Sequence, residues 1–216
     1  KTISLICYCV WRCSLRVSNK LVCGIGIKGM KYPARLGKKS LKEYDLWKNM
    51  LRRCTQKYQD VNPTYIGVTC SENFKSYEYF YEWCQTQTGF GNISCDMKSW
   101  HLDKDLLVKG NKLYGEDTCC FIPSEINVFF TKRKALRGGC HLGVNWEKDR
   151  CKFRSQCNDG AGKRVYLGLF RKEEDAFNAY KIFKENLLKG LAEKYRQQLS
   201  VYAYNALIGY EVDIKD

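Results

Sequence analysis

Long apolar stretches are missing from this sequence, because no run approaches the ~20 residues that a membrane-spanning helix needs. Histidine is scarce as well: His101 and His141 are the only two, and both lie far from any group of cysteines. No two cysteines stand in a C-x-x-C pair. We therefore expect neither a membrane partner nor a zinc knuckle, whose ligands come in closely spaced pairs.

Acidic residues are also in the minority, at 23 against 37 lysines and arginines, which gives a formal net charge of +14. Such a charge favours a polyanionic partner, either nucleic acid or an anionic membrane surface. Because no segment could span a membrane, nucleic acid is the better supported of the two. The alternative is a basic protein whose charge serves only its solubility.

Cysteine, in contrast, is abundant, with 13 residues. A secreted disulfide scaffold would be shorter and rich in loops, and an odd number leaves one thiol unpaired. Several of these residues fall on apolar faces of predicted helices or strands, where cysteine acts as a small hydrophobic residue: Cys54, Cys84, Cys151 and Cys157. We therefore predict a reduced, intracellular protein. Metal binding stays open for one N-terminal group, which comprises Cys7, Cys9, Cys13 and Cys23.

The first half of the chain predicts two amphipathic helices. Residues 41–59 place apolar side chains at helical spacing on one side and basic side chains on the other. Residues 73–87 repeat this spacing with many aromatic residues, and Ser71 is the expected N-cap. The basic segment 28–42 precedes them and suits either contacts to a DNA backbone or a solvated linker.

The most informative segment spans residues 143–180. Residues 150–158 and 163–170 alternate polar and apolar side chains, which predicts two antiparallel strands joined by the glycine-rich turn 159–162. In the second strand, Val165, Leu167 and Leu169 form the apolar set. We expect a third strand at residues 142–146.

A helix is predicted to follow this sheet. It begins at Glu173, because acidic residues are stabilised at the positive end of a helix dipole, and it runs to about Leu199. A short helix is expected at residues 201–208. The resulting unit is a three-stranded antiparallel sheet packed on a helix.

The solvent face of this predicted sheet carries side chains that read base edges and bind phosphates, and neither of its two main strands places Asp or Glu there. A ribbon of strands fits the major groove of DNA. The expected base-facing residues are Arg154, Gln156, Asn158, Arg164 and Tyr166. The expected phosphate-contacting residues are Arg150 and Lys152, together with Lys132, Arg133, Lys134 and Arg137 from the preceding basic run. The alternative is an ordinary polar sheet face.

This segment resembles the plant ethylene-response-factor (APETALA-type) DNA-binding domain. The matching residues are Gly143-Val144, Lys152-Phe153, the strand 164–170 and the helix start 173–180. The resemblance implies that the sheet lies in the major groove of duplex DNA. Tyr166 stands in place of a family tryptophan, and Asn145 and Asn158 in place of the usual arginines, so the family's target sequence does not carry over.

Residues 100–127 have the order strand, Lys-Gly-Asn turn, strand and helix, with the helix starting near Pro123. This order resembles the HNH (ββα-metal) nuclease finger. The longer segment 44–195 resembles phage-encoded HNH proteins that also carry an ethylene-response-factor-like domain. The resemblance implies that a strand-end aspartate and a helix asparagine bind one divalent metal, for which Mg²⁺ suits the oxygen ligands, while a neighbouring histidine activates water.

In this sequence Asp103 or Asp105 supplies the carboxylate and Asn127 or Asn111 the amide, so Asp103 and Asn127 are the expected metal ligands. A lysine follows Asp103 where the family has histidine, and lysine is a poor general base unless its pKa is strongly depressed. His101 is the expected substitute as catalytic base. The alternatives are structural turn acids and an ordinary, partly buried histidine.

Together these patterns predict an α+β fold with three regions: strands and two helices in 1–95, a degenerate ββα-metal finger in 96–137, and the sheet and helix in 138–216. The preferred hypothesis is a sequence-selective duplex-DNA-binding protein of phage type, acting in the host cytoplasm. One alternative is a Mg²⁺-dependent, homing-type DNA endonuclease. Another is a phage interaction protein that inhibits a host nucleic-acid enzyme.

Overall fold

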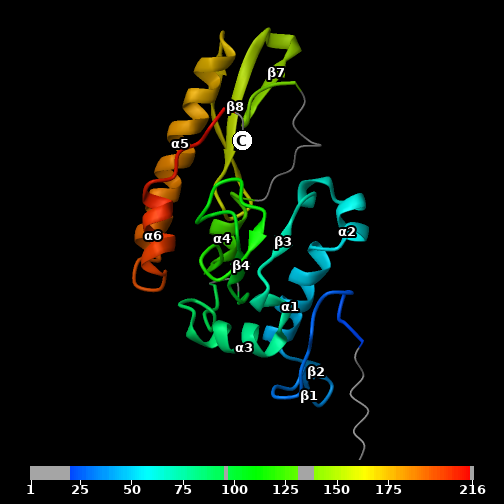
Figure 1. The fold of residues 1–216 in the computed structure, drawn as a ribbon. Coiled ribbons are helices and arrows are strands. Elements are labelled where there is room, and N and C mark those ends of the chain that lie inside the picture. The colour runs from blue at the N-terminus through cyan, green and yellow to red at the C-terminus, as the bar shows by residue number, and fades with distance from the viewer. Residues whose placement is uncertain (1–19, 95–96, 131–138, 215–216) are drawn as a thin grey trace, which may run out of the picture.

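The computed structural model describes residues 20–94, 97–130 and 139–214 of the chain (Figure 1). Helices and short strands alternate, which confirms the predicted α+β class. Several predicted features lie outside the described residues: the N-terminal cysteines up to Cys13, and the phosphate-contacting set Lys132, Arg133, Lys134 and Arg137.

Two helices, α1 (Lys42–Arg53) and α2 (Gln56–Val61), replace the single helix predicted at 41–59. The break is at Thr55, which has an extended backbone and whose side chain accepts a hydrogen bond from the Tyr58 backbone N–H at 3.4 Å. A hydroxyl in this N-cap position satisfies one of the N–H groups left free at a helix start. The prediction of one continuous helix was wrong because the apolar spacing continues through this break.

The second predicted helix also divides, into the 3₁₀ helix η2 (Asn73–Lys75) and the helix α3 (Tyr77–Thr86). Ser71 accepts a hydrogen bond from the Phe74 N–H in η2, but the N-cap residue of η2 is Glu72. Ser76 is the N-cap of α3, because its hydroxyl accepts from the Tyr79 N–H at 3.3 Å. The prediction of Ser71 as the N-cap was therefore wrong, because the helix begins later, at Tyr77, and Ser71 bonds to the 3₁₀ turn before it.

Strand pairing around residues 100–122 differs from the prediction. β4 (His101–Asp103) pairs antiparallel with β6 (Cys120–Ile122), whereas β5 (Leu113–Tyr114) pairs parallel with β3 (Thr69–Cys70). All three residues of β6 are buried, so β6 is the core strand beside which β4 packs. The helix α4 (Ser124–Asn127) follows β6 and packs against β4. A strand–strand–helix unit is thus formed, but with a long loop in place of the predicted tight turn.

The main apolar core brings together segments from residues 47–130 and the last two helices of the chain. It contains Trp47 of α1, Phe80 of α3 and Phe121 of β6, together with the C-terminal half of α5 (Glu173–Lys194) and with α6 (Val201–Ile208). α6 packs against the neighbouring α5, and both helices contribute buried residues to this core. This core therefore crosses the expected region boundaries near residues 95 and 137.

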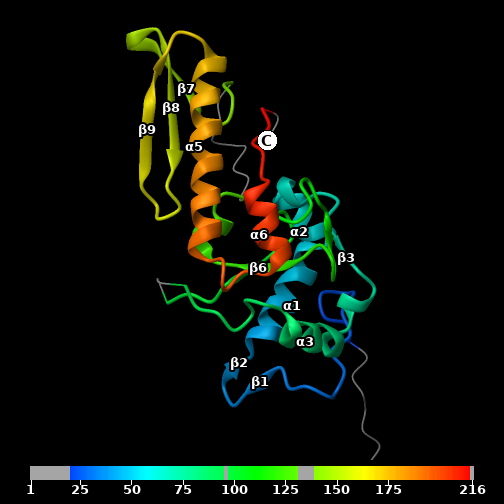
Figure 2. The same ribbon diagram turned by 90° about the vertical axis from the view of Figure 1, so that its left-hand side faces the viewer.

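A second apolar cluster lies between α5 and the sheet of β7 (Val144–Glu147), β8 (Lys152–Asn158) and β9 (Arg164–Phe170). The strands are antiparallel in the order β7-β8-β9, which confirms the predicted three-stranded sheet on a helix. Ala176, Phe177 and Tyr180 of α5 are buried against it. Since the other half of α5 lies in the main core, this single helix connects the two clusters (Figure 2).

A β-bulge changes which side chains of β9 face the helix. Gln156 is opposite Tyr166 but Ser155 is opposite Gly168, so Leu167 is an extra residue in β9. Gly168 has a φ of +135°, in the region that favours glycine. Beyond the bulge Leu169 is no longer among the residues packed in the cluster with α5, and Phe170 takes that role. The prediction that Leu169 continues the apolar set was wrong, because an inserted residue inverts the alternation.

Candidate nucleic-acid interface

The face of the sheet opposite α5 brings the predicted base-facing residues together. Ser155 and Cys157 of β8 are buried, so the alternate side chains of this strand point away from the helix. Cross-strand pairing then sets the neighbours of these outward side chains. The outward pairs are Asn145 with Arg154, Gln156 with Tyr166, and Asn158 with Arg164.

Two members of this face are open to a ligand. Arg164 is exposed, and Tyr166 has 60% of its surface accessible. The side chains of Lys152 and Arg164 form no ion pair within the described part of the chain. Both side chains can therefore meet a polyanion, although Glu147 lies directly opposite Lys152 in the pairing of β7 with β8.

The Arg154 side chain forms an ion pair with an acidic residue that the sequence patterns of β8 and β9 could not reveal. Its Nη1 lies 2.8 Å from Oε1 of Glu147, which comes from the third strand, β7. Arg150 Nε is 3.9 Å from the same carboxylate. The Nε of Arg154 is buried and has no hydrogen-bond partner. Glu147 thus holds Arg154 in one orientation and offsets part of the positive charge at this corner of the face.

Asn158 takes part in the hairpin turn as well as in the face. Its Oδ1 accepts a hydrogen bond from the Gly160 N–H at 2.7 Å, and Asp159 Oδ1 accepts from Ala161 and Lys163 in the same turn. The turn itself lies against α4, because a side-chain carbon added at Gly160 would be 2.9 Å from the Glu125 carbonyl oxygen. One of the two acceptor positions of Asn158 Oδ1 is therefore used within the turn, while its amide N–H groups can be offered to a ligand.

The connection between β7 and β8 differs from the prediction that strand begins at residue 150. Arg150 ends the 3₁₀ helix η4 (Lys148–Arg150), and Cys151 follows with a left-handed φ of 48°. Cys151 is exposed instead of lying on an apolar strand face. Sequence reasoning also missed Trp146, which is 44% exposed and packs on its cross-strand partner Phe153 with 4.7 Å between ring centroids, on the side of the sheet that faces α5.

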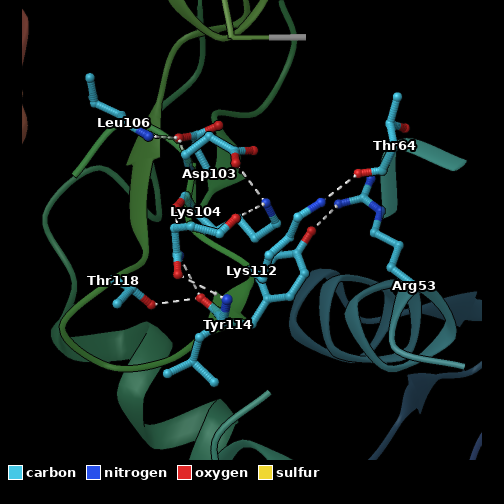
Figure 3. A network of polar contacts seen from close by, with 11 residues as sticks. Arg53, Thr64, Asp103, Lys104, Leu106, Lys112, Tyr114 and Thr118 are labelled. Carbon is cyan, nitrogen blue, oxygen red and sulfur yellow. Dashed lines mark hydrogen bonds and ion pairs between the residues drawn. The ribbon is translucent and has the colours of Figure 1, made fainter. Parts of the chain in front are cut away.

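The predicted metal ligand Asp103 is buried, with 6% of its surface accessible. Its Oδ1 accepts hydrogen bonds from the backbone N–H groups of Asp105 at 2.9 Å and Leu106 at 2.7 Å (Figure 3). Burial raises the pKa of this carboxyl to about 6, and the nearby Asp105 carboxylate contributes in the same direction. In this arrangement Asp103 closes the turn that follows β4.

The residues beside Asp103 form a polar network that holds the loop between β4 and β6. Lys104 Nζ lies 2.6 Å from Asp105 and donates to the Asn111 carbonyl at 3.0 Å. Asn111 in turn donates to the carbonyls of Lys104 and Leu113, both at 2.7 Å. Figure 3 shows this network next to Tyr114, whose hydroxyl accepts from Arg53 at 3.0 Å. Asp105 and Asn111 thus have structural partners.

His101 and Asn127 complete the set predicted for the nuclease. His101 is exposed at the start of β4, while Asn127 is the last residue of α4. Among residues 20–94, 97–130 and 139–214, no group of three or more His, Cys, Asp or Glu side chains is arranged to hold a metal ion. Mg²⁺ binding by Asp103 and Asn127, and catalysis by His101, stay predictions.

Over the same described ranges, no helix combines the length and the apolar character needed to cross a membrane. Comparison of the chain with models of protein families, with curated proteins and with solved structures gave no match. The geometry of the sheet face is therefore the basis for a functional proposal.

Proposed function

We propose that this protein binds duplex DNA through the solvent face of the β7-β8-β9 sheet, and that it does so with sequence selectivity. The observation that carries the proposal is the alignment of Lys152, Gln156, Arg164 and Tyr166 on one face of neighbouring strands, opposite the helix. The major groove of B-DNA is about 12 Å wide and admits a ribbon of strands. The donors on this face and the ribbon of strands that carries them support the proposal.

Each side chain has a distinct part in the proposed complex. The exposed guanidinium of Arg164 suits the paired acceptors of guanine or a phosphate, and the amide of Gln156 suits adenine. Lys152 provides a positive charge for the DNA backbone. Arg154, held by Glu147, has a fixed direction and serves to orient the face.

The scaffold supports recognition because α5 covers the other side of the sheet. Ser155 and Cys157 are buried, and Phe177 and Tyr180 pack in the same cluster. The strands are thereby fixed before the ligand arrives, which lowers the entropic cost of binding. The formal net charge of +14 would also speed the encounter with DNA and make binding sensitive to salt.

Fluorescence anisotropy with a labelled duplex tests this proposal. The double variant Lys152→Ala/Arg164→Ala is expected to bind at least ~10-fold more weakly. The slope of log K against log salt concentration should become shallower by about one for each lost phosphate contact. The variant Gln156→Ala is expected to lose preference at one base position, found by selection from random duplexes, while its salt dependence stays unchanged.

Lys189→Glu is a matched control, because it changes the net charge by two units, as the double variant does, at an exposed position of α5. Circular dichroism checks that all variants keep the fold. If the double variant binds duplex DNA as tightly as the unmodified protein does, the sheet face is not the interface.

We also propose that the protein works in a reducing, intracellular setting. This is supported by the state of the described cysteines, all of which are free thiols. Cys84, Cys120 and Cys157 are buried, and burial raises the pKa of each thiol. Such thiols pack as small hydrophobic side chains and are poorly reactive.

A further inference from the structure

The basic segment 28–42 is attached to the body of the protein by several side chains. The Glu78 carboxylate accepts a hydrogen bond from the backbone N–H of Lys31 at 2.7 Å. The Tyr77 hydroxyl donates to the Pro33 carbonyl at 3.0 Å. These contacts fix the segment to α3, which a solvated linker would not require.

Further contacts join the same segment to α1 and again to α3. The Ser40 hydroxyl donates to Asp45 of α1 at 2.7 Å. The rings of Tyr32 and Tyr81 stack with 3.9 Å between their centroids. The segment is thus held by both α1 and α3.

The tip of this segment is a small antiparallel hairpin, formed by β1 (Arg35–Leu36) and β2 (Lys39–Ser40). Residues 35–39 are all exposed. The side chains of Arg35, Lys38 and Lys39 make no ion pair or hydrogen bond with any residue that the structure describes. By contrast, Lys31, outside the tip, is paired with Glu82. The fold therefore presents three uncompensated positive charges on an anchored support.

We propose that this β1–β2 hairpin is a second contact to the phosphate backbone of the duplex that the sheet binds. The proposal rests on the proposed function of the sheet. Lysine and arginine side chains placed along a duplex release counterions from the phosphates, and that release is the main source of sequence-independent affinity. Anchoring of the hairpin reduces the ordering cost of such a contact.

The position of the hairpin sets the length of duplex that is needed. The sheet and the β1–β2 hairpin lie at opposite ends of the molecule in both ribbon views (Figures 1 and 2). α5 has 22 residues, and at 1.5 Å per residue it is ~33 Å long, about one turn of B-DNA. The hairpin lies beyond the end of α5 that enters the main core (Figure 1). A duplex that contacts both surfaces must therefore extend more than one turn past the sheet.

Binding to duplexes of two lengths tests this proposal. Fluorescein-labelled duplexes of about one turn and about three turns, ~10 and ~30 base pairs, carry the same sequence selected from random DNA. The variant Lys38→Ala/Lys39→Ala is expected to match the unmodified protein on the short duplex. On the long duplex it should bind ~10-fold more weakly. Its slope of log K against log salt concentration should become shallower by about two, because two phosphate contacts are lost.

Lys189→Glu removes the same two units of charge, and it is expected to keep full affinity on the long duplex. Lys38→Arg/Lys39→Arg should also keep it. An equal loss of affinity on the short and long duplexes would show that the hairpin acts only through the overall charge. Unchanged affinity on both duplexes would exclude a contact. Either result overturns the proposal. If the unmodified protein binds neither duplex at low salt, the proposed function of the sheet fails as well.

Discussion

Replacement of Asp103 separates its role in the fold from its predicted role as a metal ligand. The Asp103 carboxylate is buried and accepts two backbone hydrogen bonds, from Asp105 and Leu106. Asparagine keeps an acceptor oxygen and removes the buried charge, whereas alanine leaves both N–H groups without this partner. We expect Asp103→Asn to be more stable than Asp103→Ala, by about 1–3 kcal/mol for each N–H group that stays buried.

The pKa of Asp103 gives the size and the pH range of the effect. Burial raises this pKa from 3.8 to about 6, so the folded protein favours the protonated form. This difference in pKa corresponds to roughly 3 kcal/mol, at about 1.36 kcal/mol per pKa unit. Because the folded pKa is the higher one, the stabilisation by the proton is complete below pH 3.8 and is lost as the pH rises through about 6. At pH 7.5 the aspartate therefore carries the full cost of its buried charge.

Urea unfolding followed by tryptophan fluorescence measures these differences. Asp103→Asn should exceed the unmodified protein in its free energy of unfolding at pH 7.5, by up to about 3 kcal/mol, and this advantage should shrink towards pH 4. A variant that is less stable than the unmodified protein at pH 7.5 would refute the reasoning. If Mg²⁺ raised the stability of the unmodified protein but not of Asp103→Asn, the carboxylate would be a metal ligand.

Two further predictions concern the nuclease resemblance and the β-bulge. If the chain is a Mg²⁺-dependent endonuclease, it nicks plasmid DNA in Mg²⁺ and Asp103→Ala abolishes the nicking; the absence of cleavage in both Mg²⁺ and Mn²⁺ contradicts this hypothesis. Gly168→Ala should destabilise the protein by more than ~1 kcal/mol in thermal unfolding, because its φ of +135° disfavours an added side chain. Unchanged stability would show that the β9 backbone readily adopts another conformation.

The elements around the sheet could be predicted from local patterns. Alternation in β8 and β9 and the acidic start of α5 are properties of neighbouring residues, so the sequence alone locates these elements. The bulge at Leu167 could not be predicted in this way, because it depends on the register between two strands. The ion pair of Arg154 with Glu147 is likewise a contact across strands.

The region around Asp103 also depends on contacts between distant segments, which the local sequence does not predict. The sequence places a strand at residues 101–103, but the partner of that strand is set by the burial of Phe121 and its neighbours in the core. The apolar repeat of the first helix also passes through the break at Thr55. Local spacing predicts where side chains face, and tertiary packing decides which segments meet.

The shared helix α5 has a consequence for how the two ends of the molecule are aligned. Tyr180 is buried against the sheet and Leu188 in the main core, with uninterrupted helix between them. One residue inserted there would turn the sheet by ~100° about the helix axis and move it by 1.5 Å relative to the core. The number of residues between Tyr180 and Leu188 therefore fixes the direction in which the polar face of the sheet points relative to the main core.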